Sequence, residues 1–411
     1  MRLVKLNSSQ FDKFAESHTY KNYFQTSMYA NVMKKFGYKT DYLGIANEYN
    51  KLIGATLIIY KEVFGKYKMA YAPRGILFNY DNKKLIFELT EKLRNVLGKQ
   101  KFMLLRIDPY IPLSIRDNEG TITNINNKGN EIINNLTKAG FIYKGKNLFF
   151  ETEKPRWEAL VLLQKDINEI FSKLDKRTRN KIRRAINSGI NIIKDETKSV
   201  NKLYQFAGKK DEKPLSFYKQ MVLNYESNID VYYANLDTEK LVINSKRNYE
   251  KEIEYNSMIA EKVQDMSLNE DERNNYLNKK MASDKLITTY KHNLLIATNL
   301  LKNYPNGIDI GGVMVIKYDN AAFIFSEGID DEYGYLNATD LMRWQLINDY
   351  NKQGLKYLNL NAIVGEFEKK NKYGGLNESK LGFNATVTEY IGEFDIILNN
   401  FTYNLYKKFK K

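Results

Sequence analysis

Residues 312–360, GVMVIKYDNAAFIFSEGIDDEYGYLNATDLMRWQLINDYNKQGLKYLNL, contain the alternation of elements that decides the fold. Two apolar runs, 312–318 and 322–326, stand on either side of the pair Asp319-Asn320. Asp and Asn tolerate the left-handed backbone of a tight turn, so this arrangement predicts a β-hairpin.

A helix and a further strand are expected after this hairpin. Asn337 and Asp340 are suited to begin a helix over residues 338–352, and Gly354 is suited to end it. Residues 357–360 then return as a short apolar strand. The order hairpin, helix, strand is typical of an α/β unit.

The first half of the chain contains the same order. Apolar runs at 42–47 and 52–64 predict a hairpin, and a strand is expected at 69–72. A helix over 82–97 and a buried strand at 102–107 follow. The sequence therefore predicts a duplicated α/β unit.

We assign residues 1–153 to the first unit and 154–392 to the second, with 393–411 completing the first. A polar insertion at 239–303 interrupts the second unit where a tight turn would otherwise join two strands. Within it, residues with seam-forming side chains recur at spacings of three and four, and a capping box is expected at 267–270. These features predict an antiparallel helical hairpin, a coiled-coil arm about 40 Å long at 1.5 Å per residue.

The composition excludes several kinds of active site. The 411-residue chain contains no Cys, which excludes disulfides, thiolate nucleophiles and Cys-ligated zinc. It contains two histidines, His18 and His292, too few for a His-rich metal site. We expect neither a metal nor a cofactor, and catalysis by Lys, Asp, Glu, Tyr, backbone dipoles or the substrate itself.

The charge and the hydropathy of the chain limit the kinds of partner and the location that we expect. Lys and Arg number 64 and Asp and Glu number 49, a formal net charge of +15 that favours a polyanion or an anionic surface as partner. Residues 1–7 lack the apolar run of a signal peptide, and no window of about 18 apolar residues is present to span a membrane. We expect a soluble, cytoplasmic protein, and the sequence predicts nothing about its oligomeric state.

The densest basic run lies at 173–184, where seven cations accompany one acidic residue, Asp175. The cations are Lys173, Lys176, Arg177, Arg179, Lys181, Arg183 and Arg184. Like charges repel at this density unless a polyanion neutralises them, which favours binding of RNA or nucleotide phosphate. A solvated surface helix is the alternative, and the residues alone leave both open.

Two further stretches contain candidate site residues. Arg74 stands between Pro and Gly at the end of an expected strand. It is either presented there as a bidentate donor for a phosphate or carboxylate, or it belongs to a plain turn. Lys380 follows a glycine-bearing loop, where it either stabilises a developing oxyanion or is a surface lysine.

Five stretches, taken in order, resemble the Fem-type (FemABX) nonribosomal peptidyltransferases. They are FQTSMYAN at 24–31, AYAPRG at 70–75, KRTRNKIRRA at 176–185, KLGF at 380–383 and EYIGEFD at 389–395. The resemblance implies two acetyltransferase-like (GNAT) domains in tandem, and many such proteins carry a helical arm inserted in the second. The duplication and the arm predicted above agree with this implication.

The resemblance also implies a reaction. In such enzymes an amine of the stem peptide of a peptidoglycan precursor, either lipid II or UDP-MurNAc-pentapeptide, attacks the ester carbonyl of an aminoacyl-tRNA and so builds the interpeptide bridge. The ester arrives activated, so no covalent enzyme intermediate is needed, and aminoacyl-tRNA is a co-substrate rather than a cofactor. A lipid-linked precursor would place the protein peripherally at the inner face of the membrane.

Two alternatives stand beside this interpretation. One is a non-catalytic RNA-binding or coiled-coil interaction protein that keeps the basic run and the arm. The other is an aminoacyl-tRNA-dependent transferase that acts on another amine.

The resemblance assigns roles to individual residues. It places Lys380 at the reacting centre, with Ser379 where the family often has Phe. The precursor-binding residues are expected to be Lys34, Lys35, Arg74, Lys213, Phe217, Tyr218 and Phe325. The basic run supplies the expected tRNA-binding residues Lys176, Arg177, Arg179, Lys181, Arg183 and Arg184.

Besides Ser379, four places depart from the family pattern. Met33 aligns nearest to a family lysine, Lys213 replaces an Arg and lacks its forked guanidinium, and Phe325 replaces a Tyr and lacks its hydroxyl. Residues 361–363, Asn-Ala-Ile, replace a Gly-Gly-Ile loop. These departures predict a different precursor or a different binding mode.

Overall fold

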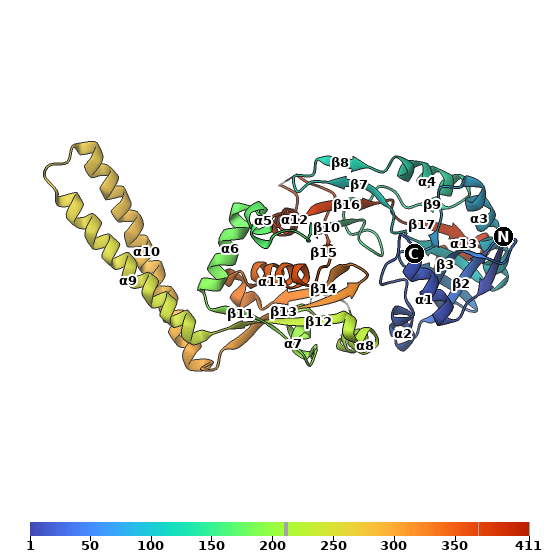
Figure 1. The fold of residues 1–411 in the computed structure, drawn as a ribbon, viewed down its shortest axis with the longest axis horizontal. Helices are drawn as coiled ribbons and strands as arrows, with labels where there is room; N and C mark the ends of the chain where they lie inside the picture. The colour runs from blue at the N-terminus through green and yellow to red at the C-terminus, as the bar shows by residue number, and fades with distance from the viewer. Residues whose placement is uncertain (209–212, 369, 411) are drawn as a thin grey trace.

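The computed structural model of the protein describes residues 1–208, 213–368 and 370–410 and contains two β-sheets and a long helical hairpin (Figure 1). The hairpin projects from one end of the molecule, the second sheet lies in the middle, and the first sheet lies at the other end. Among the described residues, no helix has both the length and the apolar character needed to cross a bilayer.

The first sheet has the order β1-β2-β3-β4-β6-β17-β9, with β5 paired to β3. Its strands are β1 Arg2–Lys5, β2 Lys39–Ala46, β3 Leu52–Phe64, β4 Tyr67–Ala72, β5 Leu77–Phe78, β6 Phe102–Ile107, β9 Ile142–Tyr143 and β17 Phe394–Ile397. Leu57, Ile58 and Ile59 in β3 are all buried, because helices cover both faces of this sheet. These helices are α1 Ser8–Ser17 and α2 Ser27–Lys35 on one face, and α3 Lys83–Lys99 and α4 Asn127–Lys138 on the other.

The second sheet has the order β11-β12-β13-β14-β15-β10-β16-β7-β8. Its strands are β7 Pro112–Arg116, β8 Ile122–Ile125, β10 Trp157–Leu162, β11 Ile190–Lys194, β12 Ile229–Leu236, β13 Ile308–Tyr318, β14 Ala321–Ile329, β15 Tyr357–Ala362 and β16 Thr386–Tyr390. The helices of this half are α5 Ile167–Lys173, α6 Lys176–Asn187, α7 Asn201–Ala207, α8 Leu215–Tyr225, α11 Ala338–Lys352 and α12 Gly374–Leu381, and α13 Asn400–Lys410 ends the chain. Short 3₁₀ turns occur at Glu226–Asn228 and Asp331–Leu336.

The two halves exchange strands. β7 and β8 come from the first half of the chain but extend the second sheet through the β16–β7 pairing, whereas the C-terminal β17 lies in the first sheet between β6 and β9. The proposed domain bounds, 1–153 and 154–392 with 393–411 returning to the first, stay a prediction. The strand pairings show that segments of the chain cross between the two sheets.

The hairpin–helix–strand order around residues 312–360 is confirmed, with one correction. β13 and β14 form the hairpin, Asp319 has a φ of 55°, and Gly354 ends α11 with a φ of 76°. Asn337 precedes α11 in a left-handed conformation, but its side chain does not cap the helix. It donates instead to the carbonyl of Tyr335, because the 3₁₀ turn before α11 directs it backwards.

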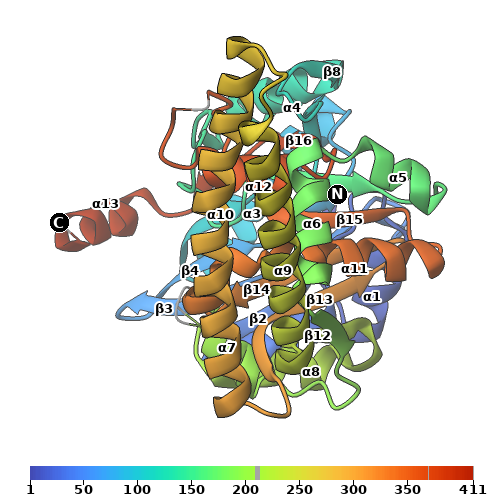
Figure 2. The same cartoon turned by 90° about the vertical axis from the view of Figure 1, so that its left-hand side faces the viewer.

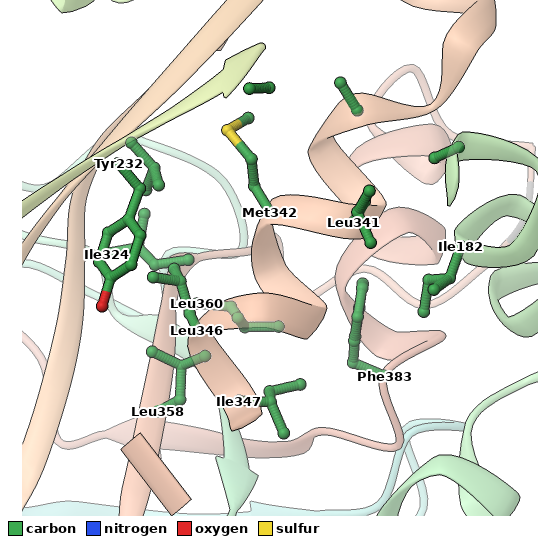
Figure 3. Packing of buried hydrophobic residues seen from close by; sticks show 14 of the residues in the cluster. Ile182, Tyr232, Ile324, Leu341, Met342, Leu346, Ile347, Leu358, Leu360 and Phe383 are labelled. Carbon is green, nitrogen blue, oxygen red and sulfur yellow. The ribbon is translucent and has the colours of Figure 1, made fainter. Parts of the chain in front are cut away.

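α11 packs against the second sheet. Figure 3 shows Leu346 of α11 close to Leu358 and Leu360 of β15. Leu341 lies on the side of α11 toward Ile182 of α6, and all five side chains are buried. A separate apolar cluster joins the two halves, because α2 of the first packs against α8 of the second. The site described below lies next to this junction.

The predicted arm is an antiparallel pair of helices, α9 Thr238–Gln264 and α10 Glu270–Asn303 (Figure 2). α10 contains 34 residues, which corresponds to about 51 Å, longer than expected. The expected capping box at 267–270 is wrong by two residues: Asn269 and Glu272 form it. The seam is partly polar, with Asn256 donating to Asp284 and Ser283 donating to Glu252.

Candidate active site

A cavity opens where two parallel strands of the second sheet separate. β14 and β15 pair over Ala321–Phe323 and Tyr357–Asn359 and then diverge. The opening holds a cavity of about 240 Å³, which we call the splay cavity. It is lined by Asn22, Tyr23, Phe24, Glu153, Lys154, Pro155, Glu158, Lys213, Phe323, Ile324, Phe325, Asn359, Asn361 and Ala362. Both halves of the chain therefore contribute to its walls.

A β-bulge in β14 determines which side chains face the cavity. Met314 pairs with Ser326 and Val315 with Ile324, which leaves Phe325 as the extra residue of the bulge. The extra residue reverses the alternation of side chains along the strand. Ile324 packs into the core under α11, Phe325 packs against α8, and Glu327 turns back toward α11.

Glu158 of β10 is the centre of a buried polar network beside the cavity. Its Oε1 accepts a hydrogen bond from Arg74 at 2.6 Å. Its Oε2 accepts hydrogen bonds from Tyr110 at 3.1 Å, Tyr390 at 2.9 Å and Asn359 at 2.7 Å. Four donors from four segments of the chain thus hold one carboxylate in place. The sequence signal that could have found it is a charged residue inside the apolar strand WEALVL.

Arg74 is bound within the protein rather than presented to solvent. Its side chain is 3% exposed, and its guanidinium lies between the rings of Tyr110 and Tyr390, 5.0 and 4.9 Å from their centroids. It also forms an ion pair with Asp108 at 3.6 Å. Two carboxylates of the chain itself therefore bind the guanidinium of Arg74, and the assignment of Arg74 to the precursor stays a prediction.

Asp108 is the second carboxylate of this network. Its Oδ1 accepts from the backbone N–H of Arg74 at 2.6 Å, which secures the left-handed residue in its tight turn. Burial raises the pKa of Asp108 above its usual range, although the neighbouring Arg74 acts in the opposite direction. The pair ties the end of β4 to the end of β6.

Two lysines face the cavity with aromatic rings beneath them. Lys154 Nζ lies 4.0 Å from the ring centroid of Phe24, and Lys213 Nζ lies 5.4 and 5.1 Å from the centroids of Phe217 and Phe325. Burial and the charge of Lys213 lower the pKa of Lys154 to about 8. Within the described parts of the chain, neither ammonium has a carboxylate at ion-pair distance. The two cations are therefore available to an anionic ligand.

The structure brings together four of the predicted precursor-binding residues and separates two. Phe217 stacks on Phe325 at 6.3 Å, Lys213 lies over both rings, and Tyr218 meets Phe325 edge-on at 6.2 Å. Lys34 and Lys35 are exposed at the end of α2 and are not among the residues that line the cavity. Lys154, which the sequence did not single out, lines the cavity together with Lys213 and Phe325.

Lys380 is buried behind one wall of the cavity. It is 6% exposed, and its Nζ donates to the carbonyl of Ala362 at 2.8 Å. The surface-lysine alternative is therefore wrong, because α12 packs this residue under β15. Burial lowers the pKa of Lys380 to about 8, against the opposing effect of the nearby Glu327 carboxylate.

Arg343 fixes the turn of α12 that carries Lys380. It is buried on α11, where it forms an ion pair with Glu327. Its Nη1 donates to the carbonyl of Ser379 at 2.9 Å and to the hydroxyl of Ser379 at 3.1 Å. Ser379 is thus part of a polar support for Lys380.

Six of the seven cations of the basic run lie on α6, and their surroundings differ. Arg179 donates to the carbonyls of Ser172 and Leu174, and Arg183 lies 5.4 Å from the ring centroid of Phe171. The other four cations line an open groove of about 610 Å³, namely Lys176, Arg177, Lys181 and Arg184. Arg177 also pairs with Glu378 of α12, which connects the groove to the helix of Lys380. The tRNA assignments stay predictions.

Comparisons with known proteins agree with this architecture. The FemAB family model matches residues 6–411. Aminoacyltransferase FemA of Staphylococcus epidermidis is 24% identical over 426 residues, and FemA of Staphylococcus aureus strain MRSA252 is 24% identical over 429 residues. Each alignment covers 100% of this chain and 99% of the relative.

A solved structure shows the same fold. The crystal structure of FemX superposes with a TM-score of 0.71 at 18% identity, covering 98% of this chain and 99% of that chain. A tandem GNAT protein from the clavulanic acid biosynthesis pathway aligns with a TM-score of 0.48 at 8% identity over 97% of this chain and 98% of that one. The predicted fold class, two acetyltransferase-like units with an inserted helical arm, is confirmed. Since a family model matches nearly the whole sequence, the chain belongs to the FemAB family.

Proposed function

We propose that this protein transfers an amino acid from aminoacyl-tRNA to an amine on the stem peptide of a peptidoglycan precursor. The FemAB family match and the relatives named as aminoacyltransferases support a transferase. The observation that carries the proposal is the splay cavity. Two lysines lie on its wall, neither with a carboxylate at ion-pair distance among the described residues, and the buried Lys380 lies behind it.

The reaction needs little covalent chemistry from the protein. The amine attacks the ester carbonyl, a C–N bond forms, the C–O bond to the tRNA ribose breaks, and the proton lost by the amine ends on the departing hydroxyl. Charge develops on the carbonyl oxygen between these steps, and a preorganised cation there lowers the barrier. Lys380 supplies that charge in the proposal, held by Ala362 and by the support of Arg343.

Binding of the two substrates follows the charge distribution. Lys154 and Lys213 bind an anionic group of the precursor at the cavity wall, with the rings of Phe24, Phe217 and Phe325 beneath them. The groove of α6 binds the phosphates of the tRNA, because a polyanion relieves the repulsion among its cations. The aminoacyl end then reaches the cavity past α12, which contacts α6 through Arg177 and Glu378.

The deciding experiment mixes the purified chain with tRNA charged with a labelled amino acid and with UDP-MurNAc-pentapeptide or lipid II. Mass spectrometry of the precursor is expected to show one added residue at a stem-peptide amine. RNA binding without transfer to either precursor would favour a non-catalytic RNA-binding protein. Transfer to another amine but to neither precursor would favour the alternative transferase.

A further inference from the structure

The C-terminal helix α13 stands away from the rest of the molecule. Its first turn is tied to the first sheet, because the backbone N–H groups of Leu398 and Asn399 both donate to the carbonyl of Met103. Asn399 then caps the helix by accepting from the N–H of Thr402 at 3.1 Å. Figure 2 shows α13 extending outward from the rest of the molecule.

The sequence of α13 is amphipathic. Phe401, Leu405 and Phe409 recur every fourth residue, a spacing that puts these positions on one helix face. Phe401 is 78% exposed although it is large and apolar. Residues 400–411 also include four lysines and no acidic residue, and all four lysines come after Leu405. An apolar face beside a basic face is typical of a helix that lies in a membrane interface.

A second projecting segment, at the end of β3, also carries exposed apolar and basic residues. The end of β3 and the turn after it carry Val63, which is 40% exposed, and the exposed lysines Lys61 and Lys66. The exposed Glu62 also lies there, and its charge is paired with Lys39. Figure 2 shows the end of β3 extending from the same side of the molecule as α13. Two basic segments with exposed apolar residues therefore face one direction.

We propose that α13 and the β3–β4 turn dock this protein on the surface of an anionic lipid bilayer. The helix would lie parallel to the surface, since its 11 residues span about 16 Å, roughly half the apolar thickness of a bilayer. Phe401 and Leu405 enter the boundary between headgroups and acyl chains, and the lysines contact anionic headgroups.

Charge favours a bilayer over a second copy of the chain as the occupant. Residues 400–411 and the exposed part of the turn are basic, and the whole chain carries a net charge of +15, so two copies would repel one another at this face. An anionic surface attracts both projections at once. This inference rests on the proposed function, because it concerns where the transferase works. The flotation assay that tests it contains none of the transferase's substrates.

The test is flotation of the full chain with vesicles of phosphatidylcholine alone or mixed with phosphatidylglycerol. The chain is expected to float with the anionic vesicles, and to be released as salt rises. The double variant Lys407→Gln/Lys408→Gln should bind about fivefold more weakly for each lysine removed at low salt. The double variant Phe401→Ser/Leu405→Ser, which keeps every charge, should also lose most of the binding.

A matched control removes two exposed lysines from the arm, Lys285→Gln/Lys291→Gln, and should leave flotation unchanged. All variants should keep their transfer to UDP-MurNAc-pentapeptide, so a failure of docking is distinct from a failure of the proposed activity. Equal flotation with neutral vesicles, or loss in the control equal to that in the α13 variants, would overturn the proposal. So would a dimer of the wild-type chain that Phe401→Ser/Leu405→Ser dissociates, because a second copy would then cover this face.

Discussion

At the scale of single residues, the site depends on lysines whose surroundings change their chemistry. Lys380 and Lys154 are both buried enough for their pKa values to fall to about 8. Each therefore loses its proton at a pH where an exposed lysine stays charged. This property separates the two lysines experimentally from the many other lysines of the chain.

Lys380→Met should lower kcat by about 100- to 1,000-fold, the effect of removing one preorganised charge from a reacting oxygen. It should not lower the melting temperature, because the lowered pKa of Lys380 means that burial of its ammonium is unfavourable. In the wild type, kcat should fall as the pH rises through about 8, where Lys380 deprotonates. Lys380→Arg should extend activity to higher pH, and an unchanged pH profile in that variant would remove Lys380 from the reaction.

Lys154→Met should raise the KM for the precursor about tenfold and leave kcat nearly unchanged, since a hydrogen bond between charged partners contributes about 1.5–3 kcal/mol. The wild-type KM should also rise above pH 8, as Lys154 becomes neutral. Steady-state kinetics with the precursor as the varied substrate measures both effects. The control is Lys165→Met, which changes an exposed lysine that pairs with Glu169 and is not among the residues that line the cavity. An equal rise in the KM of this control would contradict the assignment of Lys154.

At the scale of the element, α6 carries two kinds of cation: some line a groove, and others contact carbonyls or an aromatic ring of the protein itself. Lys176→Gln/Arg184→Gln removes two charges from the groove, whereas Arg179→Gln/Arg183→Gln removes two that contact carbonyls or Phe171. The groove variant should bind tRNA more weakly and reduce the slope of log K against log salt by about 1.4–1.8. The second variant should change that slope less, and the reverse order would contradict the groove as the tRNA site.

At the scale of the whole molecule, Arg74 and Glu158 connect the two halves. The loop after β4 carries Arg74, and β10 of the second sheet carries Glu158. Arg74→Leu leaves two buried carboxylates without their cation and should lower the free energy of unfolding by about 3–5 kcal/mol. Adding Glu158→Gln should recover part of the loss, because the charge that needed Arg74 is gone.

Urea unfolding of the two single variants and the double variant measures this coupling. The variant Arg106→Gln serves as the comparison, since Arg106 pairs with Asp395 inside the first sheet and does not bridge the halves. Purely additive losses from Arg74→Leu and Glu158→Gln would show that the two side chains do not act together.

The sequence by itself determined the order of the elements, the arm and the exclusion of thiol chemistry. Turns, helix ends and apolar periodicities depend on residues near one another in the chain, so 312–360 could be interpreted without any tertiary contact. The local signal also had limits. The side chain of Asn337 does not cap α11, and the cap of α10 is Asn269 rather than a residue at the expected position.

The tertiary structure alone decided the site. Arg74 meets Glu158 across 84 positions of sequence, and Lys154 and Lys213 reach the same cavity from segments 59 positions apart. The burial of Lys380 depends on α12 packing under β15, and no local pattern specifies that depth. Contacts of this kind arise when two sheets, joined by exchanged strands, bring distant segments together, and the pKa values that define the chemistry exist only after that packing excludes water.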